Sequence, residues 1–259
     1  MAATLQLSKV ALRVSDLERS RAFYVDRLGF VVSHRDRDHL ALATAPSAPS
    51  ILTLEVAPDL APPPPGTAGL FHAALLFPNR PGLASWLAFA AARQVEFAGF
   101  SDHAVSEAVY LSDPDGNGLE FYRDRPRAEW PFEGLEVAMT TRALDIHALL
   151  AEARPTDMPL AGSAWGHLHL RVTDLARSEG FYRDTLGLVT TQSSYPGARF
   201  MAADGYHHHL GLNTWGQPRG AQPANTPGLA AATFAVAGLA ETRRLFDPDN
   251  IPLQLEPLQ

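Results

Sequence analysis

The side chains with the clearest chemical potential are two histidines and one glutamate in separate strand-like segments. His72, Glu120 and His167 each lie in a run where apolar residues alternate with others. Alternate residues of a strand point to opposite faces of a sheet, so all three are predicted to face the concave side. Two neutral imidazoles and one carboxylate on one face suit Fe(II), Mn(II) or a related divalent ion, with coordination positions open for substrate and oxygen.

Three further positions are predicted to lie near these ligands. Tyr110 opposes its apolar strand neighbours and converges with the ligands. In the run of three histidines at 207–209, strand alternation places His209 on the concave face, and a kink would place His208 there instead. His103 could orient a substrate or cap a loop.

Each of these residues also has an ordinary structural explanation. A single buried histidine on a strand is more often a hydrogen-bonded core residue, and Glu120 could pair with an arginine. Tyr110 could be a core residue with a satisfied hydroxyl, and the histidine run could lie at the surface. Taken together, the set favours a metal site. The segment 113–118 is predicted to form a turn with no chemistry of its own.

Composition excludes several other kinds of protein. The 259 residues carry a formal charge of −7, which argues against a nucleic-acid partner, because such binding depends on Lys and Arg. The chain has no cysteine, so disulfides, thiolate zinc sites and cysteine nucleophiles are excluded. No segment approaches the ~20 apolar residues of a membrane span, and no signal peptide is evident. We expect a cytoplasmic protein without a membrane partner, and a homo-oligomer stays open.

A repeat with an offset of 158 residues organises the chain. Residues 14–20 match residues 172–178, and Phe-Tyr, Asp and Leu-Gly recur after both segments. In the first copy, a strand leads to a helix at 17–27, which Asp16 caps and Gly29 ends. Three more strands are predicted, at 29–33, 39–44 and 51–56. The module is therefore βαβββ and the fold class is α+β.

Two divergent copies complete the chain. The second module opens at 69 and contains a helix at 82–93, whereas the last module, from 228, is shortened and leaves room only for a stub of helix at 239–246. Segments rich in Pro and Gly separate the copies. This division predicts a first domain of two modules at 5–126, a linker with a helix (142–153) at 127–162, and a second domain of one full and one reduced module at 163–259.

These motifs resemble the vicinal oxygen chelate superfamily, which includes glyoxalases, bleomycin and fosfomycin resistance proteins and extradiol ring-cleaving dioxygenases. The resemblance covers nearly the whole chain and implies tandem modules that form two cupped mixed sheets. Four segments are similar to the bacterial catechol-2,3-dioxygenase group, namely 69–72, 101–120, 166–170 and 205–209.

The resemblance implies an enzyme that uses Fe(II), with Mn(II) as the second candidate, to cleave a small aromatic diol with O2. The metal ligands that it implies are His72, His167 and Glu120. His209, or His208 in its place, would perform acid–base catalysis, and Tyr110 would lie near the ring of the substrate. His103 is retained as a candidate substrate-binding residue.

The chain departs from this family in where its ligands lie. Extradiol enzymes usually take the second histidine and the glutamate from the last module, but the matching positions here are near Ala231 and Gln254. The first module has Lys9 in place of a histidine. We therefore expect the second and third modules to pair across the middle linker and hold one metal site. The first and last modules would form a metal-free scaffold.

Two other functions stay open at this level. A glyoxalase-like isomerase or lyase would use the same metal, but it would need a second carboxylate ligand and no oxygen. A resistance or carrier protein would only sequester a ligand in a metal-free cup.

Overall fold

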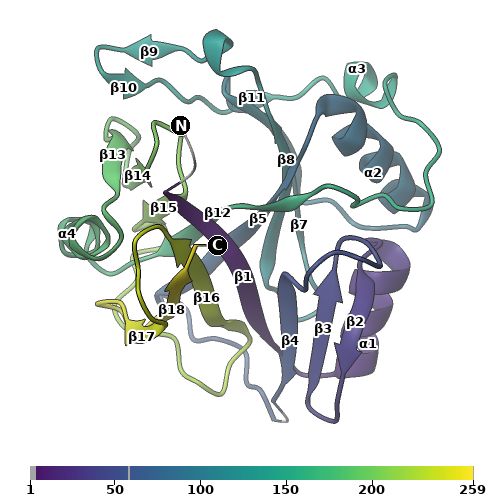
Figure 1. The fold of residues 1–259 in the computed structure, drawn as a ribbon, viewed down its shortest axis with the longest axis horizontal. Coiled ribbons are helices and arrows are strands. Elements are labelled where there is room, and N and C mark those ends of the chain that lie inside the picture. The colour runs from purple at the N-terminus through teal and green to yellow at the C-terminus, as the bar shows by residue number, and fades with distance from the viewer. Residues whose placement is uncertain (1–3, 58, 259) are drawn as a thin grey trace.

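The strands form two large mixed sheets that lie beside each other (Figure 1). This computed structural model describes residues 4–57 and 59–258. The larger sheet has nine strands in the order β11 (Arg142–Ala143), β6 (Gly99–Asp102), β7 (Ser106–Ser112), β8 (Gly118–Asp124), β5 (Gly69–Phe77), β12 (Ala164–Arg171), β15 (Leu210–Asn213), β14 (Ala198–Ala202) and β13 (Val189–Gln192). The smaller has seven, in the order β17 (Arg243–Phe246), β18 (Pro252–Pro257), β16 (Gly228–Val236), β1 (Leu5–Val14), β4 (Leu52–Val56), β3 (His39–Ala43) and β2 (Val31–Arg35). The predicted α+β class is confirmed.

The sheets follow the predicted pairing of modules. The second module (β5–β8) and the third (β12–β15) share the nine-stranded sheet, whereas the first and last modules supply the seven-stranded sheet. β5 pairs with β12 antiparallel, and β1 pairs with β16 in the same way. Pairing of the second and third modules across the middle linker is therefore confirmed. The domain ranges 5–126 and 163–259 stay a prediction.

Each full module carries a helix that begins at a side-chain cap. The helices are α1 (Leu17–Arg21), which continues as the π-helix η1 (Ala22–Arg27), α2 (Arg80–Ala92) and α4 (Leu175–Leu186). Asp16, Asn79 and Asp174 accept hydrogen bonds from backbone amides of the first turn. The helix predicted at 17–27 is confirmed. Among the described residues, no helix combines the length and the apolar character that a membrane crossing requires.

Two local predictions differ from the structure, and one strand was not predicted. The linker helix predicted at 142–153 is only α3 (Ile146–Leu150), because Arg142–Ala143 pairs with β6 instead. The last module forms strand β17 in place of a helical stub, because those residues pair with β18. Strand β6 was not predicted, since four residues are too few for an alternating pattern to stand out.

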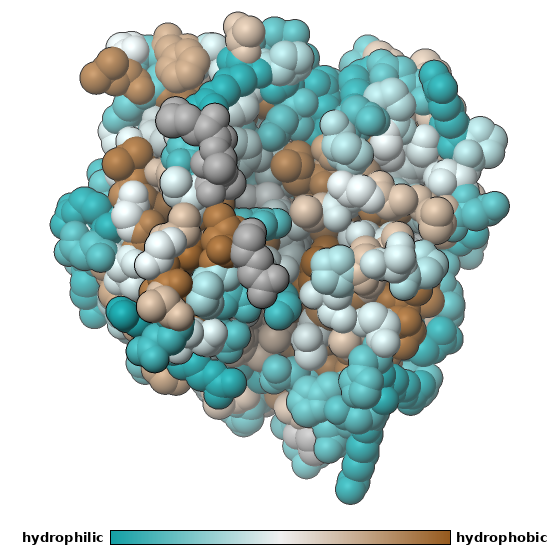
Figure 2. Space-filling view, viewed as in Figure 1, coloured by the Kyte–Doolittle hydropathy of each residue, from teal (hydrophilic) through white to brown (hydrophobic). Residues whose placement is uncertain are grey.

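The linker also forms the single-turn 3-10 helix η2 (Arg127–Glu129) and a hairpin of β9 (Phe132–Glu133) and β10 (Glu136–Val137). Much of the face seen in Figure 2 is hydrophilic, and brown atoms gather at the tip of this hairpin, where Leu135 is fully exposed. The following residues, Met139 to Thr141, return to the nine-stranded sheet and line the cavity described below.

Two equivalent contacts, which we call the tyrosine–aspartate clamps, join the sheets. The buried hydroxyl of Tyr24 in η1 donates to Asp113 Oδ2 at 2.9 Å, and that of Tyr182 in α4 donates to Asp247 Oδ2 at 3.0 Å. Each clamp crosses between the sheets. The first clamp joins the first module to the second module, and the other joins the third module to the last. The turn at 113–118, for which no role was predicted, therefore anchors a helix of the neighbouring sheet.

A second aspartate at each clamp holds the start of the same helix. Asp115 accepts a hydrogen bond from Ser15 Oγ at 2.6 Å and forms an ion pair with Arg19. Asp249 makes the same contacts with the equivalent residues of the third module. The repeat thus preserves the attachment of its helices as well as their sequence.

Removal of a clamp hydroxyl is expected to destabilise the fold. Tyr24→Phe and Tyr182→Phe should each lower the free energy of unfolding by about 1–3 kcal/mol, because a buried aspartate loses a hydrogen-bond donor. Urea unfolding followed by circular dichroism measures this change. Tyr195→Phe is the control, since its hydroxyl bonds to Thr141 in an exposed position, and it should shift the value by less than about 0.5 kcal/mol. Equal effects in all three variants would contradict the role of the clamps.

Candidate metal centre

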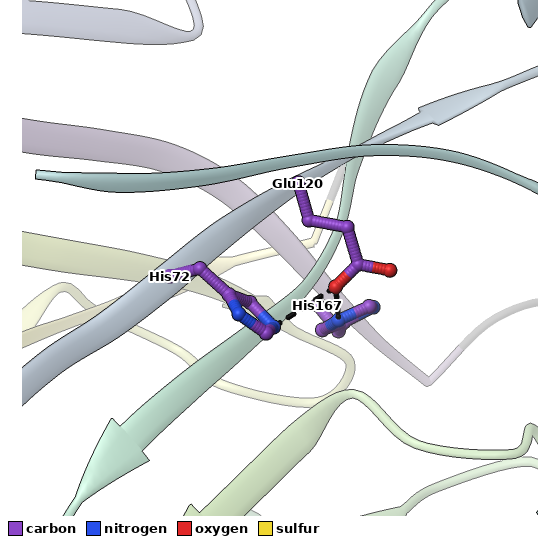
Figure 3. Close-up of side chains that lie close together, drawn as sticks. All are labelled: His72, Glu120 and His167. Carbon is purple, nitrogen blue, oxygen red and sulfur yellow. Dashed lines mark hydrogen bonds and ion pairs between the residues drawn. The ribbon is translucent and has the colours of Figure 1, made fainter. Parts of the chain in front are cut away.

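Three adjacent strands carry the predicted ligands to one point. His72 on β5, Glu120 on β8 and His167 on β12 are all buried. The Nε2 atoms of His72 and His167 lie 2.9 and 3.1 Å from the same oxygen, Glu120 Oε2 (Figure 3). One candidate ligand atom from each residue lies within 4.8 Å of the other two. This buried group could therefore hold a metal ion.

Two β-bulges direct these side chains. The pairing of β5 with β12 skips one residue at Gly166 and another at Phe71. Gly166 is required there, because a Cβ would lie 1.8 Å from the hydroxyl oxygen of Tyr122. Strand alternation predicts that Phe71 packs on the helix side, and this prediction is wrong. The bulge turns Phe71 into the cavity beside His72.

Burial and charge favour the protonation states that metal ligands need. Burial lowers the pKa of His167, so its imidazole is neutral at neutral pH. Burial alone would raise the pKa of Glu120, but His167 and His72 outweigh that effect and hold this pKa well below its usual range. A neutral imidazole and an ionised carboxylate are the forms of these groups that bind divalent metals.

His103 and Tyr110 form a hydrogen-bonded pair in the wall of the same cavity. The backbone oxygen of Thr140 lies 2.7 Å from His103 Nδ1, so this nitrogen carries the proton. Nε2 of His103 then accepts from the Tyr110 hydroxyl at 2.7 Å. Burial and the charge of Glu120 raise the pKa of Tyr110 well above its usual value, so the hydroxyl stays protonated.

The run of three histidines precedes β15 instead of lying within it, so strand alternation does not apply to it. His208 lines the cavity, and its ring centroid lies 4.0 Å from that of His167. His209 is not among the lining residues, and its Nδ1 accepts from the backbone amide of Ala203 at 3.2 Å. Of the two predicted alternatives, the observed positions favour His208 as the residue that faces the site.

His207, which had no predicted role, connects His208 to an aspartate. Its Nε2 lies 2.8 Å from Asp124 Oδ1, and its Nδ1 lies 2.7 Å from His208 Nδ1. If Nε2 of His207 donates to the carboxylate, its Nδ1 accepts from His208, which leaves a lone pair on His208 Nε2. The sequence showed the histidine run but not its contact with Asp124, 83 residues away.

The candidate metal centre opens into a cavity of about 480 Å³ with aromatic walls. The aromatic residues that line it include Phe71, Tyr195, Phe200 and Trp215. His169 lies among them, and its buried Nε2 has no hydrogen-bond partner within the described part of the chain. Such a volume accommodates a small aromatic molecule. Phe200 and Trp215 were missed because they lie outside the motifs and reach the cavity only through the fold.

Comparisons with known proteins agree on one superfamily. The family model described as Glyoxalase/Bleomycin resistance protein/Dioxygenase superfamily matches residues 6–121 and 164–257. The Bacillus subtilis (strain 168) protein named catechol-2,3-dioxygenase is 44% identical over 230 residues, which cover 84% of this chain and 78% of that protein.

Two solved structures share the fold at low identity. Glyoxalase I from Zea mays has a TM-score of 0.59 at 16% identity, with 98% of this chain and 92% of that chain covered. The cppA protein from Streptococcus pneumoniae TIGR4 has a TM-score of 0.60 at 14% identity, with 98% and 99% covered. These likenesses support the fold alone.

Loss of a proposed ligand is expected to abolish tight metal binding. Glu120→Gln and His72→Ala should each weaken the affinity for Fe(II) at least about 100-fold. Loss of a residue that only supports a ligand already lowers metal affinity by about 10–100-fold. Anaerobic titration followed by metal analysis measures the affinity. His209→Ala, which changes a histidine outside the cavity, should bind one equivalent as the parent does. Undiminished binding by Glu120→Gln would place the metal elsewhere.

Proposed function

Because the chain belongs to the glyoxalase/bleomycin resistance protein/dioxygenase superfamily, we propose that it is a metal-dependent extradiol dioxygenase. It would cleave the ring of a catechol-type aromatic diol beside the two hydroxyl groups, and both atoms of O2 would enter the product. The observation that carries this proposal is the buried group of His72, Glu120 and His167, which opens into an aromatic cavity. The 44% identity to the Bacillus subtilis catechol-2,3-dioxygenase supports it.

The donor set fits the metal that such a reaction uses. Two imidazole nitrogens and one carboxylate oxygen suit Fe(II), and Mn(II) is the second candidate. His72, His167 and Glu120 would hold this ion, and the ion would supply open coordination positions to the diol and O2. The surrounding residues determine how the diol lies and where its protons go.

We assign the acid–base role to His208. Its lone pair on Nε2 is set by the hydrogen bonds through His207 to Asp124. Burial lowers the pKa of His208 well below its usual value, so the imidazole is neutral in the free enzyme and a weak base. Its Nε2 can serve as the proton acceptor for the diol where the charge that results is offset. Asp124 would stabilise the positive charge that then develops on the two imidazoles.

Tyr110 and His103 are assigned to positioning of the substrate. While the Tyr110 hydroxyl donates to His103, its oxygen has lone pairs that can accept a hydrogen bond from a ring hydroxyl. The contact of His103 with Thr140 holds the imidazole in the tautomer that accepts this bond. Phe71 and Phe200 would pack against the ring and exclude water.

A glyoxalase-like isomerase or lyase remains the second candidate, because the same ligands would serve it. That chemistry was expected to need a second carboxylate ligand, whereas the described group contains Glu120 as its one carboxylate. A metal-free binding protein is the third candidate. Oxygen consumption separates the first function from both others.

Anaerobic reconstitution with Fe(II), followed by addition of a diol and air, should give oxygen uptake and a yellow ring-fission product. An oxygen electrode and visible absorbance measure the two signals together. The matched control is Glu120→Gln, which should show neither signal above background. Metal binding without oxygen uptake over a panel of substituted catechols would contradict the dioxygenase function and favour the isomerase.

Substitution of His208 is expected to slow turnover without loss of the metal. His208→Ala should lower kcat by about 10²–10⁴-fold, the usual contribution of a positioned acid–base group. His209→Ala should retain kcat within about twofold, because that ring lies outside the cavity. Oxygen uptake measures kcat for both variants after each is shown to bind one equivalent of Fe(II). The opposite ranking of the variants would assign the role to His209.

A further inference from the structure

Arg171 is a cation in the cavity wall that makes no ion pair with any carboxylate of the described residues. Its Nη1 donates to the backbone oxygen of Leu70 at 3.1 Å, and its Cζ lies 4.7 Å from the centroid of the Phe71 ring. The side chain is partly buried, and burial lowers its pKa. A guanidinium has five N–H donors, so most of them remain available to a ligand.

The repeat supplies an internal comparison for this arginine. Arg13 stands at the matching position of the first module, 158 residues earlier. It is in register with Glu55 on the adjacent strand, and the charge of that carboxylate opposes the lowering of the Arg13 pKa by burial. In the nine-stranded sheet the same register pairs Arg171 with Asn213. The arginine is present in both sheets, but its acidic neighbour is replaced by a neutral amide beside the metal centre.

The distance between Arg171 and the candidate metal ligands matches the length of a substituted aromatic ring. His167 and Arg171 lie on the same face of β12, four residues apart, which corresponds to ~13 Å between their Cα atoms. Since both side chains extend into the cavity, the gap between their functional groups suits one aromatic ring and a short substituent. Arg171 also borders a smaller cavity of about 70 Å³. The one carboxylate that lines this smaller cavity, Asp115, is already paired with Arg19.

We propose that Arg171 binds a negatively charged group of the substrate, so that the preferred substrates are aromatic diols with a carboxylate on the ring or on a short side chain. The inference rests on the proposed dioxygenase function. An arginine and a carboxylate form paired charge-assisted hydrogen bonds, and these are stronger where water is partly excluded. The diol end would lie at the metal ligands and the carboxylate end at Arg171.

Two probes that differ in one group test this inference, namely 3,4-dihydroxybenzoate and 4-methylcatechol. Arg171→Gln should lower kcat/KM of the Fe(II) enzyme for the carboxylate by at least about tenfold, because a charge-assisted pair is lost. It should change kcat/KM for the methyl compound by less than about threefold, which also shows that the variant is folded. Arg13→Gln is the matched control and should leave both values unchanged.

Binding without turnover provides a second readout that does not depend on the reaction. Anaerobic calorimetry should show that the parent prefers the carboxylate probe and that Arg171→Gln loses this preference. If that result is obtained without any oxygen uptake, the anion site stands and the dioxygenase function fails. If both probes are cleaved and Arg171→Gln affects them equally, the dioxygenase function stands and the role of Arg171 is overturned.

Discussion

The antiparallel pairing of β5 with β12 is the contact on which the candidate metal centre depends. It joins modules from either side of the linker and places His72 in the neighbourhood of His167, while β8, the parallel neighbour of β5, adds Glu120. Side chains alternate along a strand, so a slip of one residue would turn the histidines to the opposite face. The close approach of Tyr122 to Gly166 and the bulge at Phe71 help to fix this register.

Burial gives these ligands a strong electrostatic reason to bind a cation. An ionised carboxylate loses the solvation of water when it is enclosed, and His167 and His72 offset that loss for Glu120, which is almost completely buried. A divalent ion held by the three residues would neutralise the same charge directly. Metal affinity and local stability are therefore coupled at this site. The aromatic walls strengthen the coupling, because they keep the dielectric constant low.

Sequence reasoning succeeded where local pattern and repeat carried the information. Strand parity placed His72, Glu120 and His167 on one face, where the structure brings them together, and the missing ligands of the last module predicted which modules pair. Strand alternation failed at Phe71, where a bulge interrupts it, and at His209, which lies before the first residue of β15. A bulge adds one residue to a strand without a distinctive composition, so alternation cannot reveal it.

Contacts between distant segments were the other source of error. The helix predicted at 142–153 lost its first residues to pairing with β6, which outweighs local helix preference. The clamp formed by Tyr24 and Asp113 could not be predicted from a turn motif alone, because its partner lies 89 residues away. These features depend on tertiary contacts that no short window of the sequence contains.

In the sequence, the segment that forms the nine-stranded sheet lies between the two segments that form the seven-stranded sheet. All strands of the nine-stranded sheet come from 69–213, whereas the seven-stranded sheet combines 5–56 with 228–257. During synthesis, the metal ligands can be enclosed as soon as residue 213 has left the ribosome. Strand β1 must wait for β16 near the other end of the chain, with one edge of its backbone unpaired until then. The clamp between η1 and the turn at 113–118 offers this waiting segment an early attachment. Nascent chains stopped after β15 would therefore contain the three candidate ligands before the seven-stranded sheet is closed.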